Sequence, residues 1–384
     1  MNILVVAHYQ NDGSPTACFI HDQILAYTKL GHRVLAIVPI PIGKCALNGK
    51  RWEFHAYREN IAGVEHWFVR YFSLSNYGAN NGFNSHSAIG ALKHLLLKAL
   101  GTFKPDVIHA HTLGFDSAIG AWLKGKLHCP LVVTTHGSDT TIPIREGHPE
   151  RVKRAADAAD VVVAVSSSLQ RKLIEVGAGV RTAVILNGFN VNYAAAEQNR
   201  SPVSIVQVGH LIEQKKVDIT IRAFQKIKAS YPEATLHVIG SGRELSALQE
   251  LCRQMGLLDS VRFFGEIPNQ AVLAEMAKAR FFVMPSVREG FGIVYLEAMA
   301  CGCVTIGTEG EGIADFIVDG ENGFLVPPES PDAIVEKIEA CLTEPEWADE
   351  IAARGQQAAR AMTWEKNARQ FERLFVELVK DHAN

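Results

Sequence analysis

The sequence predicts an α/β protein built from two doubly wound domains, and three observations lead to this expectation. The chain has 384 residues, which is long for one domain and sufficient for two with cores of their own. Short β-branched runs alternate with amphipathic stretches, as in parallel sheets covered by helices. The alternation stops once, near residue 195, and then begins again. We therefore expect separate domains over residues 1–195 and 196–384.

In the first half, five apolar runs are expected to form buried parallel strands, at residues 3–7, 33–38, 107–110, 131–135 and 161–165. The polar stretch 194–202 then separates the domains. In the second half, strands are expected at residues 203–208, 235–239, 261–264, 281–284 and 304–306. Helical segments follow from Pro331 to the end of the chain.

The composition is that of a globular enzyme, with 47% hydrophobic and 21% charged residues. No apolar run approaches the roughly 20 residues that cross a bilayer, and the first residues have the pattern of a strand rather than of a signal peptide. We therefore expect a cytoplasmic protein. The seven cysteines are scattered and odd in number, which argues against a disulfide framework. Cys301 and Cys303 have no second pair nearby, so we expect buried small residues there and no metal site.

Charge is distributed unevenly along the chain. Residues 1–195 hold 19 lysines and arginines against 13 aspartates and glutamates, and the remainder holds 19 against 28. A basic first domain suggests an anionic partner, such as a phospholipid surface or a lipid-linked phosphate, although ordinary asymmetry between domains is an equal alternative. Nothing indicates a nucleic-acid partner. Residues 91–100 place leucines on one face among lysines, which fits an interfacial helix or, preferably, a core helix with lysines at its surface.

Two glutamates eight residues apart are the most informative feature of the second half. Glu289 is expected in a turn after an apolar strand, and Glu297 two helical turns further along. Glycines 290 and 292 allow close approach of a ligand to the backbone, and the free N–H groups at the start of the following helix favour anions. A phosphate-bearing ligand that spans the helix start could contact both carboxylates.

This segment resembles the E-x7-E signature of the retaining GT-B glycosyltransferases of family 4, which are also called glycosyl transferases group 1. The flanking Gly-Phe-Gly and Glu-Ala-Met-Ala match that family as well. The resemblance implies two Rossmann-like domains that face each other across a cleft, with a final helix at about 364–380 crossing back onto the first domain. It implies that Glu297 binds the ribose hydroxyls of a nucleotide sugar and that Glu289 contacts the transferred sugar. The rest of this donor-binding segment comprises Gly290, Phe291, Gly292 and Ile293.

A second segment, residues 208–218, resembles the family pattern V-G-R-L-x-x-x-K-G-x-D, whose Arg and Lys hold the donor diphosphate. Lys215 matches the lysine, and its charge suits a departing diphosphate. His210 replaces the arginine and Lys216 replaces the glycine. A neutral imidazole would hold the diphosphate less strongly than a guanidinium. Either Lys216 compensates for the missing arginine, or the phosphate keeps His210 protonated, or the donor differs.

Two further turns resemble parts of the family's nucleotide site. Gly240-Ser241-Gly242-Arg243-Glu244 is similar to a G-x-G-x-E turn, so Arg243 is expected near a phosphate or the base. Residues 265–268 are similar to a loop that holds the base through backbone groups, which suggests Ile267.

The resemblance assigns the acceptor and part of the catalytic environment to the first domain. Gly13 matches a glycine loop near the diphosphate. His136 and Asp139 match an H-G-x-D loop whose histidine lies against the donor sugar. His111 is expected to reach the cleft and, with Asp139, to contact the acceptor, whereas His109 is expected to be a buried strand-end residue.

The implied reaction transfers a hexosyl or N-acetylhexosaminyl group from a nucleotide diphosphate sugar, UDP-sugar favoured and GDP-sugar possible, to a hydroxyl with retention. The departing phosphate oxygen takes the acceptor proton in the family's front-side mechanism. No Asp-x-Asp is present, so we expect no metal and no cofactor. The acceptor is expected to be a glycan or lipid-linked molecule of surface-polysaccharide synthesis, with peripheral contact to an anionic membrane. A GT-B sugar-nucleotide epimerase and a non-catalytic nucleotide-sugar-binding protein are the alternatives.

Overall fold

A computed structural model describes residues 1–8, 18–42, 56–73, 82–190 and 200–383. The chain divides into two compact units, Met1–Gly188 with Trp364–Asn384, and Phe189–Thr363. Each unit is an α/β body with its own sheet, wholly parallel in the second unit and parallel except for one hairpin in the first, which confirms the expected fold class. The division after Gly188 precedes the expected boundary at 195, and the last residues of the chain belong to the first unit.

The first unit contains an eight-stranded sheet in the order β3-β4-β2-β1-β5-β6-β7-β8. All neighbouring strands are parallel except the hairpin of β3 and β4. The strands are β1 (Asn2–Val6), β2 (Arg33–Pro41), β3 (Tyr57–Ile61), β4 (Val64–Tyr71), β5 (Val107–His111), β6 (Leu131–Thr135), β7 (Val161–Ala164) and β8 (Arg181–Val184).

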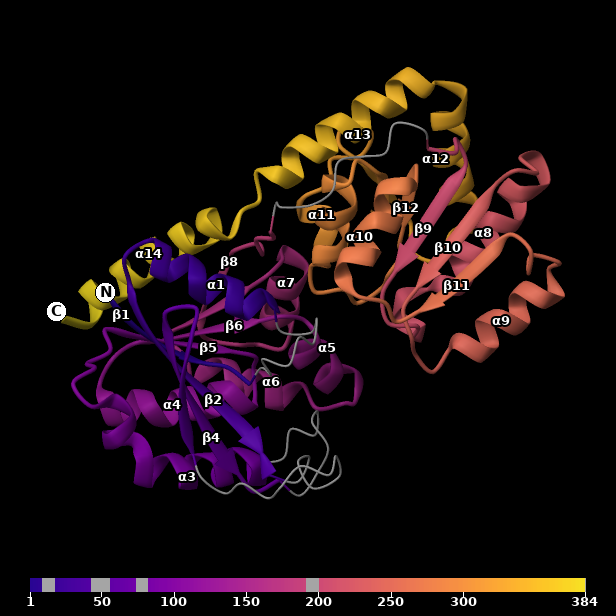
Figure 1. The fold of residues 1–384 in the computed structure, drawn as a ribbon. Coiled ribbons are helices and arrows are strands. Elements are labelled where there is room, and N and C mark those ends of the chain that lie inside the picture. The colour runs from indigo at the N-terminus through magenta and orange to yellow at the C-terminus, as the bar shows by residue number, and fades with distance from the viewer. Residues whose placement is uncertain (9–17, 43–55, 74–81, 191–199, 384) are drawn as a thin grey trace. The chain divides into compact units, whose positions relative to one another are not determined.

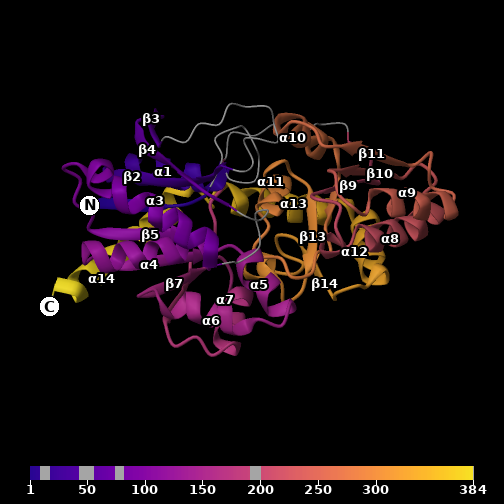
Figure 2. The ribbon, with the colours of Figure 1, turned by 90° about the horizontal axis from the view of Figure 1, so that it is seen from below.

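The helices of this unit are α1 (Cys18–Lys29), α3 (Gly82–Leu100), α4 (Phe115–Leu127), α5 (Ser138–Arg145), α6 (Pro149–Asp157), α7 (Ser167–Glu175) and α14 (Trp364–Ala383). Helices α1 and α14 lie side by side, and α3 packs against α4 and β4 (Figure 1). Helices α5, α6 and α7 pack against one another (Figure 2).

Helix α14 is amphipathic and buries an aromatic stripe in the first unit. Phe371 and Phe375 are almost fully buried, and both rings contact Tyr27 of α1 and His109 of β5. At its edges, the Gln23 amide donates to Asn367 at 2.7 Å, and His32 lies 3.1 Å from Glu372. The helix is therefore part of the core of this unit.

The leucine face of α3 also belongs to a core. Leu92 and Leu96 are buried, whereas Lys93 and Lys98 are exposed. This agrees with the core-helix alternative. Within the described ranges, no helix is long and apolar enough to span a bilayer.

The second unit contains a six-stranded parallel sheet in the order β11-β10-β9-β12-β13-β14. Its strands are β9 (Ser204–Val208), β10 (Thr235–Ile239), β11 (Val261–Gly265), β12 (Phe281–Val283), β13 (Val304–Thr308) and β14 (Phe324–Val326). Its helices are α8 (Val217–Ser230), α9 (Leu245–Gln254), α10 (Asn269–Lys278), α11 (Ile293–Ala300), α12 (Pro331–Thr343) and α13 (Pro345–Arg360), with short 3-10 turns η2 (Glu213–Lys215) and η3 (Gly312–Asp315).

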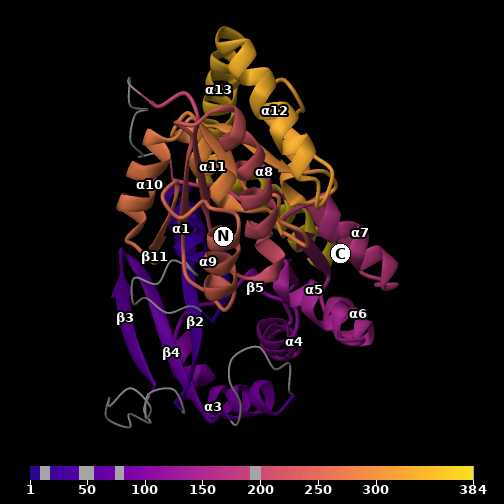
Figure 3. The same cartoon turned by 90° about the vertical axis from the view of Figure 1, so that its right-hand side faces the viewer.

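Helix α8 packs against α9 and α12, and α11 packs against α10 and α13 (Figure 3). The central strands β9, β12 and β13 are mostly apolar and buried, as expected where helices cover both faces of a parallel sheet, whereas the edge strand β11 is only partly buried. Cys301 and Cys303 are buried beside α10 and their thiols donate to main-chain carbonyls, as expected for small core residues.

Candidate functional site

Five loops of the second unit meet at the carboxyl edge of its sheet, where ligands bind in open α/β sheets. They follow β9, β10, β11, β12 and β13, which are neighbours in the sheet. Every donor-site residue predicted for this half lies in one of these loops or in α11, directly after one. The strand order thus brings together segments that are distant in the sequence.

Main-chain hydrogen bonds join these loops to one another. The N–H of Leu211 donates to Ser241 O at 2.8 Å, and the N–H of Glu244 donates back to Leu211 O at 3.0 Å. The N–H of Gly240 donates to Gly265 O at 2.8 Å. A ligand at this edge would therefore meet a connected surface rather than separate loops.

Lys215 and Glu289 form an ion pair at the centre of this edge. Both side chains are mostly buried, with exposed fractions of 16% and 13%. The Ser286 hydroxyl donates to Glu289 Oε2 at 3.0 Å, and the Gln214 amide donates to Arg288 O at 2.9 Å. The two segments that carry the pair are thus fixed to each other.

The electrostatics of Glu289 keep it ionised. Burial alone would raise its pKa, but the Lys215 ammonium and the Ser286 hydroxyl offset burial and hold the pKa below its usual value. The main-chain N–H of Glu289 donates to Glu311 at 2.9 Å, so a third carboxylate orients this residue. Neither Glu311 nor Ser286 was predicted from the sequence as a site residue.

Glu297 lies on α11, and its carboxylate differs from that of Glu289. No hydrogen bond or ion pair joins its side chain to another residue of the described ranges, although the side chain is largely covered. Burial raises the pKa of Glu297 to about 7. A covered carboxylate without a partner is suited to hydroxyl donors from a ligand.

Helix α11 begins at a sharp turn that only glycine fits well. Gly292 has a φ of 81°, and a Cβ there would lie 2.7 Å from the Tyr295 ring. The loop thereby presents its backbone at the helix start, where N–H groups lack partners within the helix. The side chain of Phe291 is buried, so this residue offers a ligand its backbone alone.

The backbone at Lys216 explains why the family pattern has glycine at this position. Its φ of 48° lies in the left-handed region that favours glycine. Its ammonium lies 2.5 Å from Glu329, so its charge is directed to that carboxylate. His210, in the loop after β9, is exposed.

Arg243 and Ile267 lie at the same edge, after β10 and β11 respectively. The Arg243 side chain is 68% exposed and lies 3.4 Å from Glu244. Ile267 is partly exposed. Both are available to a ligand.

In the first unit, the predicted residues gather at the carboxyl ends of β5 and β6. His111 was expected to reach the cleft but is fully buried, and its Nδ1 lies 3.1 Å from His136 Nε2. Asp139 accepts the main-chain N–H groups of His136, Gly137 and Leu113 at 2.8–3.1 Å, which fixes both loops. His109 is buried between Tyr27 and Thr134, as expected.

These histidines are held neutral. Burial lowers the pKa of His109 to about 3 and that of His136 to about 4, and burial places the pKa of His111 well below its usual value. One nitrogen of each of His111 and His136, Nε2 and Nδ1 respectively, is buried without a hydrogen-bond partner. Such atoms are costly unless a ligand or water meets them.

A histidine–aspartate pair beside this cluster was not found from the sequence. His8 Nδ1 lies 2.6 Å from the fully buried Asp116, which also accepts the Thr112 hydroxyl at 3.0 Å. Burial alone would lower the pKa of His8, but Asp116 raises it above its usual value. The two residues are 108 positions apart, so no local pattern joins them. The predicted Gly13 lies outside the described residues.

Comparisons with known proteins agree with this geometry. The model of the family described as "Glycosyl transferases group 1" matches residues 194–360, and that of "Glycosyltransferase Family 4" matches residues 19–193. An uncharacterized glycosyltransferase of Methanocaldococcus jannaschii is 30% identical over 277 residues, covering 71% of this chain and 76% of that protein.

Two solved structures share the fold. Sucrose-phosphate synthase from Thermosynechococcus elongatus has a TM-score of 0.80 at 19% identity, over 99% of this chain and 100% of that one. Anabaena HepE, in complex with UDP and glucose, has a TM-score of 0.72 at 21% identity, over 98% and 100%. The chain therefore belongs to the group 1 glycosyl transferases of glycosyltransferase family 4 and has their GT-B fold.

Proposed function

We propose that the protein transfers a hexosyl or N-acetylhexosaminyl group from a nucleotide diphosphate sugar to a hydroxyl, with retention at the anomeric carbon. Three groups at one sheet edge support the proposal: the ion pair of Lys215 and Glu289, and Glu297, whose carboxylate has no partner among the described residues. UDP-sugars are the favoured donors because HepE was solved with UDP and with UDP-glucose, and GDP-sugars are the second choice.

Each group has a defined task in this reaction. Lys215 and the start of α11 neutralise the charge that develops on the departing diphosphate. Glu297 accepts the two ribose hydroxyls, and Glu289 and His136 contact the transferred sugar. The departing phosphate oxygen takes the acceptor proton, so the transfer needs neither a protein base nor a metal ion.

For the acceptor, we propose a glycan or a lipid-linked molecule used in surface-polysaccharide synthesis. The excess of basic residues in the first half of the chain supports an anionic acceptor or contact with an anionic membrane. Asp139 is the residue proposed to contact the acceptor, since His111 is fully buried. We place this reaction in the cytoplasm, at the inner face of the membrane.

The test is release of free UDP from UDP-glucose and UDP-N-acetylglucosamine, with and without glucose, N-acetylglucosamine and their octyl glycosides. Transfer requires UDP release that depends on the acceptor and is lost in Glu289→Gln. The rate should be the same in EDTA and in magnesium. An isomerised nucleotide sugar formed without acceptor would show an epimerase, and tight donor binding without any turnover would show a binding protein.

A further inference from the structure

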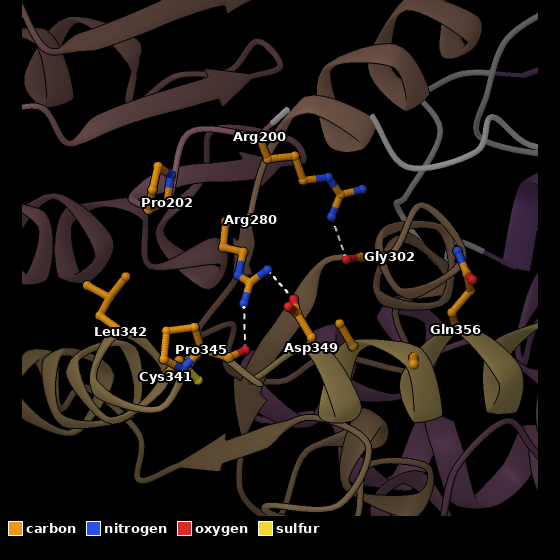
Figure 4. A pocket seen from close by; sticks show the side chains of 11 residues that line it. Arg200, Pro202, Arg280, Gly302, Cys341, Leu342, Pro345, Asp349 and Gln356 are labelled. Atoms are coloured by element: carbon orange, nitrogen blue, oxygen red, sulfur yellow. Dashed lines mark hydrogen bonds and ion pairs between the residues drawn. The ribbon is translucent and has the colours of Figure 1, made fainter. Parts of the chain in front are cut away.

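A cavity of about 510 Å³ lies in the second unit, at the amino ends of its strands. Arg200 and Pro202 precede β9, Arg280 precedes β12, and Gly302 precedes β13. Helix α13 and the end of α12 complete the wall (Figure 4). The proposed donor site occupies the opposite edge of the same sheet, so this cavity has no role in the reaction above.

The Arg200 guanidinium points toward the ends of two helices. It donates to Ala277 O at 2.8 Å, to Gly302 O at 2.5 Å and to Cys301 O. These carbonyls stand at the carboxyl ends of α10 and α11, whose dipoles favour a cation. In the described ranges no carboxylate pairs with Arg200, and two of its five N–H groups remain for another acceptor.

Arg280 supplies a second guanidinium on the same wall. It forms an ion pair with Asp349 and donates to Pro345 O at 3.2 Å (Figure 4). The Arg280 side chain is only 20% exposed, whereas Asp349 is 65% exposed. An ion pair with such a solvent-exposed carboxylate contributes little to stability. A ligand anion can therefore displace Asp349 from Arg280.

The rest of the wall is mostly apolar. Leu342, Pro345, Ala352 and Pro202 contribute carbon surface beside the two arginines. The volume lies within the range of small-molecule sites and exceeds what an inorganic anion fills. The lining therefore combines an anion-binding end with room for a compact organic body.

We propose that this cavity binds a small organic phosphate. The Arg280 guanidinium binds the phosphate group in place of Asp349, and the apolar wall surrounds the organic part. A guanidinium can bind phosphate through two parallel hydrogen bonds, whereas Asp349 accepts only one hydrogen bond from Arg280. Arg200 adds positive charge and two further donors. The proposal is independent of the proposed glycosyl transfer.

Phenyl phosphate is the probe, and its binding is measured by calorimetry and by the rise in unfolding temperature. The Lys215→Gln variant is measured in parallel, because it removes the cation of the donor site. We expect the wild type and K215Q to bind phenyl phosphate with the same affinity, and both to bind inorganic phosphate more weakly.

R280Q should weaken the binding of phenyl phosphate by about tenfold or more, because a charged hydrogen bond is lost. D349N should tighten binding about two- to fivefold, because the competing carboxylate is removed.

Arg253, exposed and paired with Glu250 in the same unit, provides the matched control, and R253Q should leave the affinity unchanged. If R280Q fails to fold, R280K and D349N decide the question, since Asp349 is exposed. Binding that is absent from the wild type, is lost in K215Q or persists in R280Q overturns the proposal. A D349N protein with unchanged affinity overturns it as well, because Asp349 then does not compete for Arg280.

Discussion

The two glutamates of the E-x7-E segment have opposite electrostatic environments. Glu289 is paired with Lys215 and stays ionised, whereas Glu297 has no partner in the described chain and its pKa is about 7. The sequence alone does not show that the two carboxylates differ in pKa. Their difference depends on Lys215, which is 74 residues from Glu289 and reaches it only in the folded unit.

The pKa of Glu297 predicts that donor binding depends on pH. The ionised form accepts hydroxyl hydrogens, so the Kd of UDP-glucose should rise as pH falls from 8 to 6, approaching tenfold per pH unit below 7. UDP-glucose is chosen because its diphosphate has no terminal phosphate that titrates in this range. Calorimetry at several pH values measures the effect, and E297Q should remove it. The same slope in E297Q would assign the titration to another group.

His210 can be tested by restoring the family residue. If the histidine merely replaces the arginine of the diphosphate clamp, H210R should hold or tighten the binding of UDP-glucose, by up to about tenfold, because a guanidinium forms charge-assisted bonds. Affinity and circular dichroism are measured together. A large loss of affinity in a folded variant would mean that His210 recognises something that arginine does not.

At the scale of elements, the sequence predicted the strands that precede the site, β9 to β13, but not their order in the sheet. It did not predict β3, β4, β8 or β14. Strand β3 is exposed and polar, and no residue of β8 is fully buried, so neither has the buried apolar run by which the other strands were predicted. The sequence also did not predict the contacts of Glu311 with Glu289 or of His8 with Asp116, because these partners are 22 and 108 residues apart in the chain. Hydrophobic periodicity locates elements, but side-chain partnerships depend on the tertiary fold.

Gly242 tests the connection between the loops after β9 and β10. A Cβ at this position would lie 2.3 Å from Leu211 O, so the two loops would have to separate. We expect G242A to cost about 1–3 kcal/mol of unfolding free energy and to weaken donor binding. Denaturant unfolding and calorimetry measure both. Gly125 has open space around its Cβ position, so G125A should cost nothing; an equally mild G242A would contradict the tight loop contact.

At the scale of the whole molecule, the chain builds two bodies, and its last helix returns to the first. The family resemblance led to this expectation, and the contacts of Phe371 and Phe375 with Tyr27 and His109 give its physical basis. The aromatic stripe of α14 alone indicates a buried face without saying which core it enters. Local pattern and long-range topology thus contribute different parts of the fold.

Removing one ring from α14 should weaken the first unit alone. Phe375 is fully buried, so F375A should cost about 3–5 kcal/mol. Hydrogen exchange should accelerate in β1, α1 and β5 but not in β9 to β13. Val376 on the same helix is exposed, and V376A should leave exchange unchanged. Faster exchange throughout both sheets would show that the two units unfold as one.

The central claim is that the carboxyl edge of the second sheet is a nucleotide-sugar site in which Glu297 accepts the ribose hydroxyls. The most direct measurement is a calorimetric titration of UDP into the wild-type protein and E297A, without added metal. We expect micromolar binding to the wild type and a Kd about tenfold to a hundredfold higher for E297A, the loss of a charged hydrogen-bond pair. Equal affinity in the two proteins would remove Glu297 from the site, and no binding of UDP, GDP or ADP to the wild type would contradict the claim.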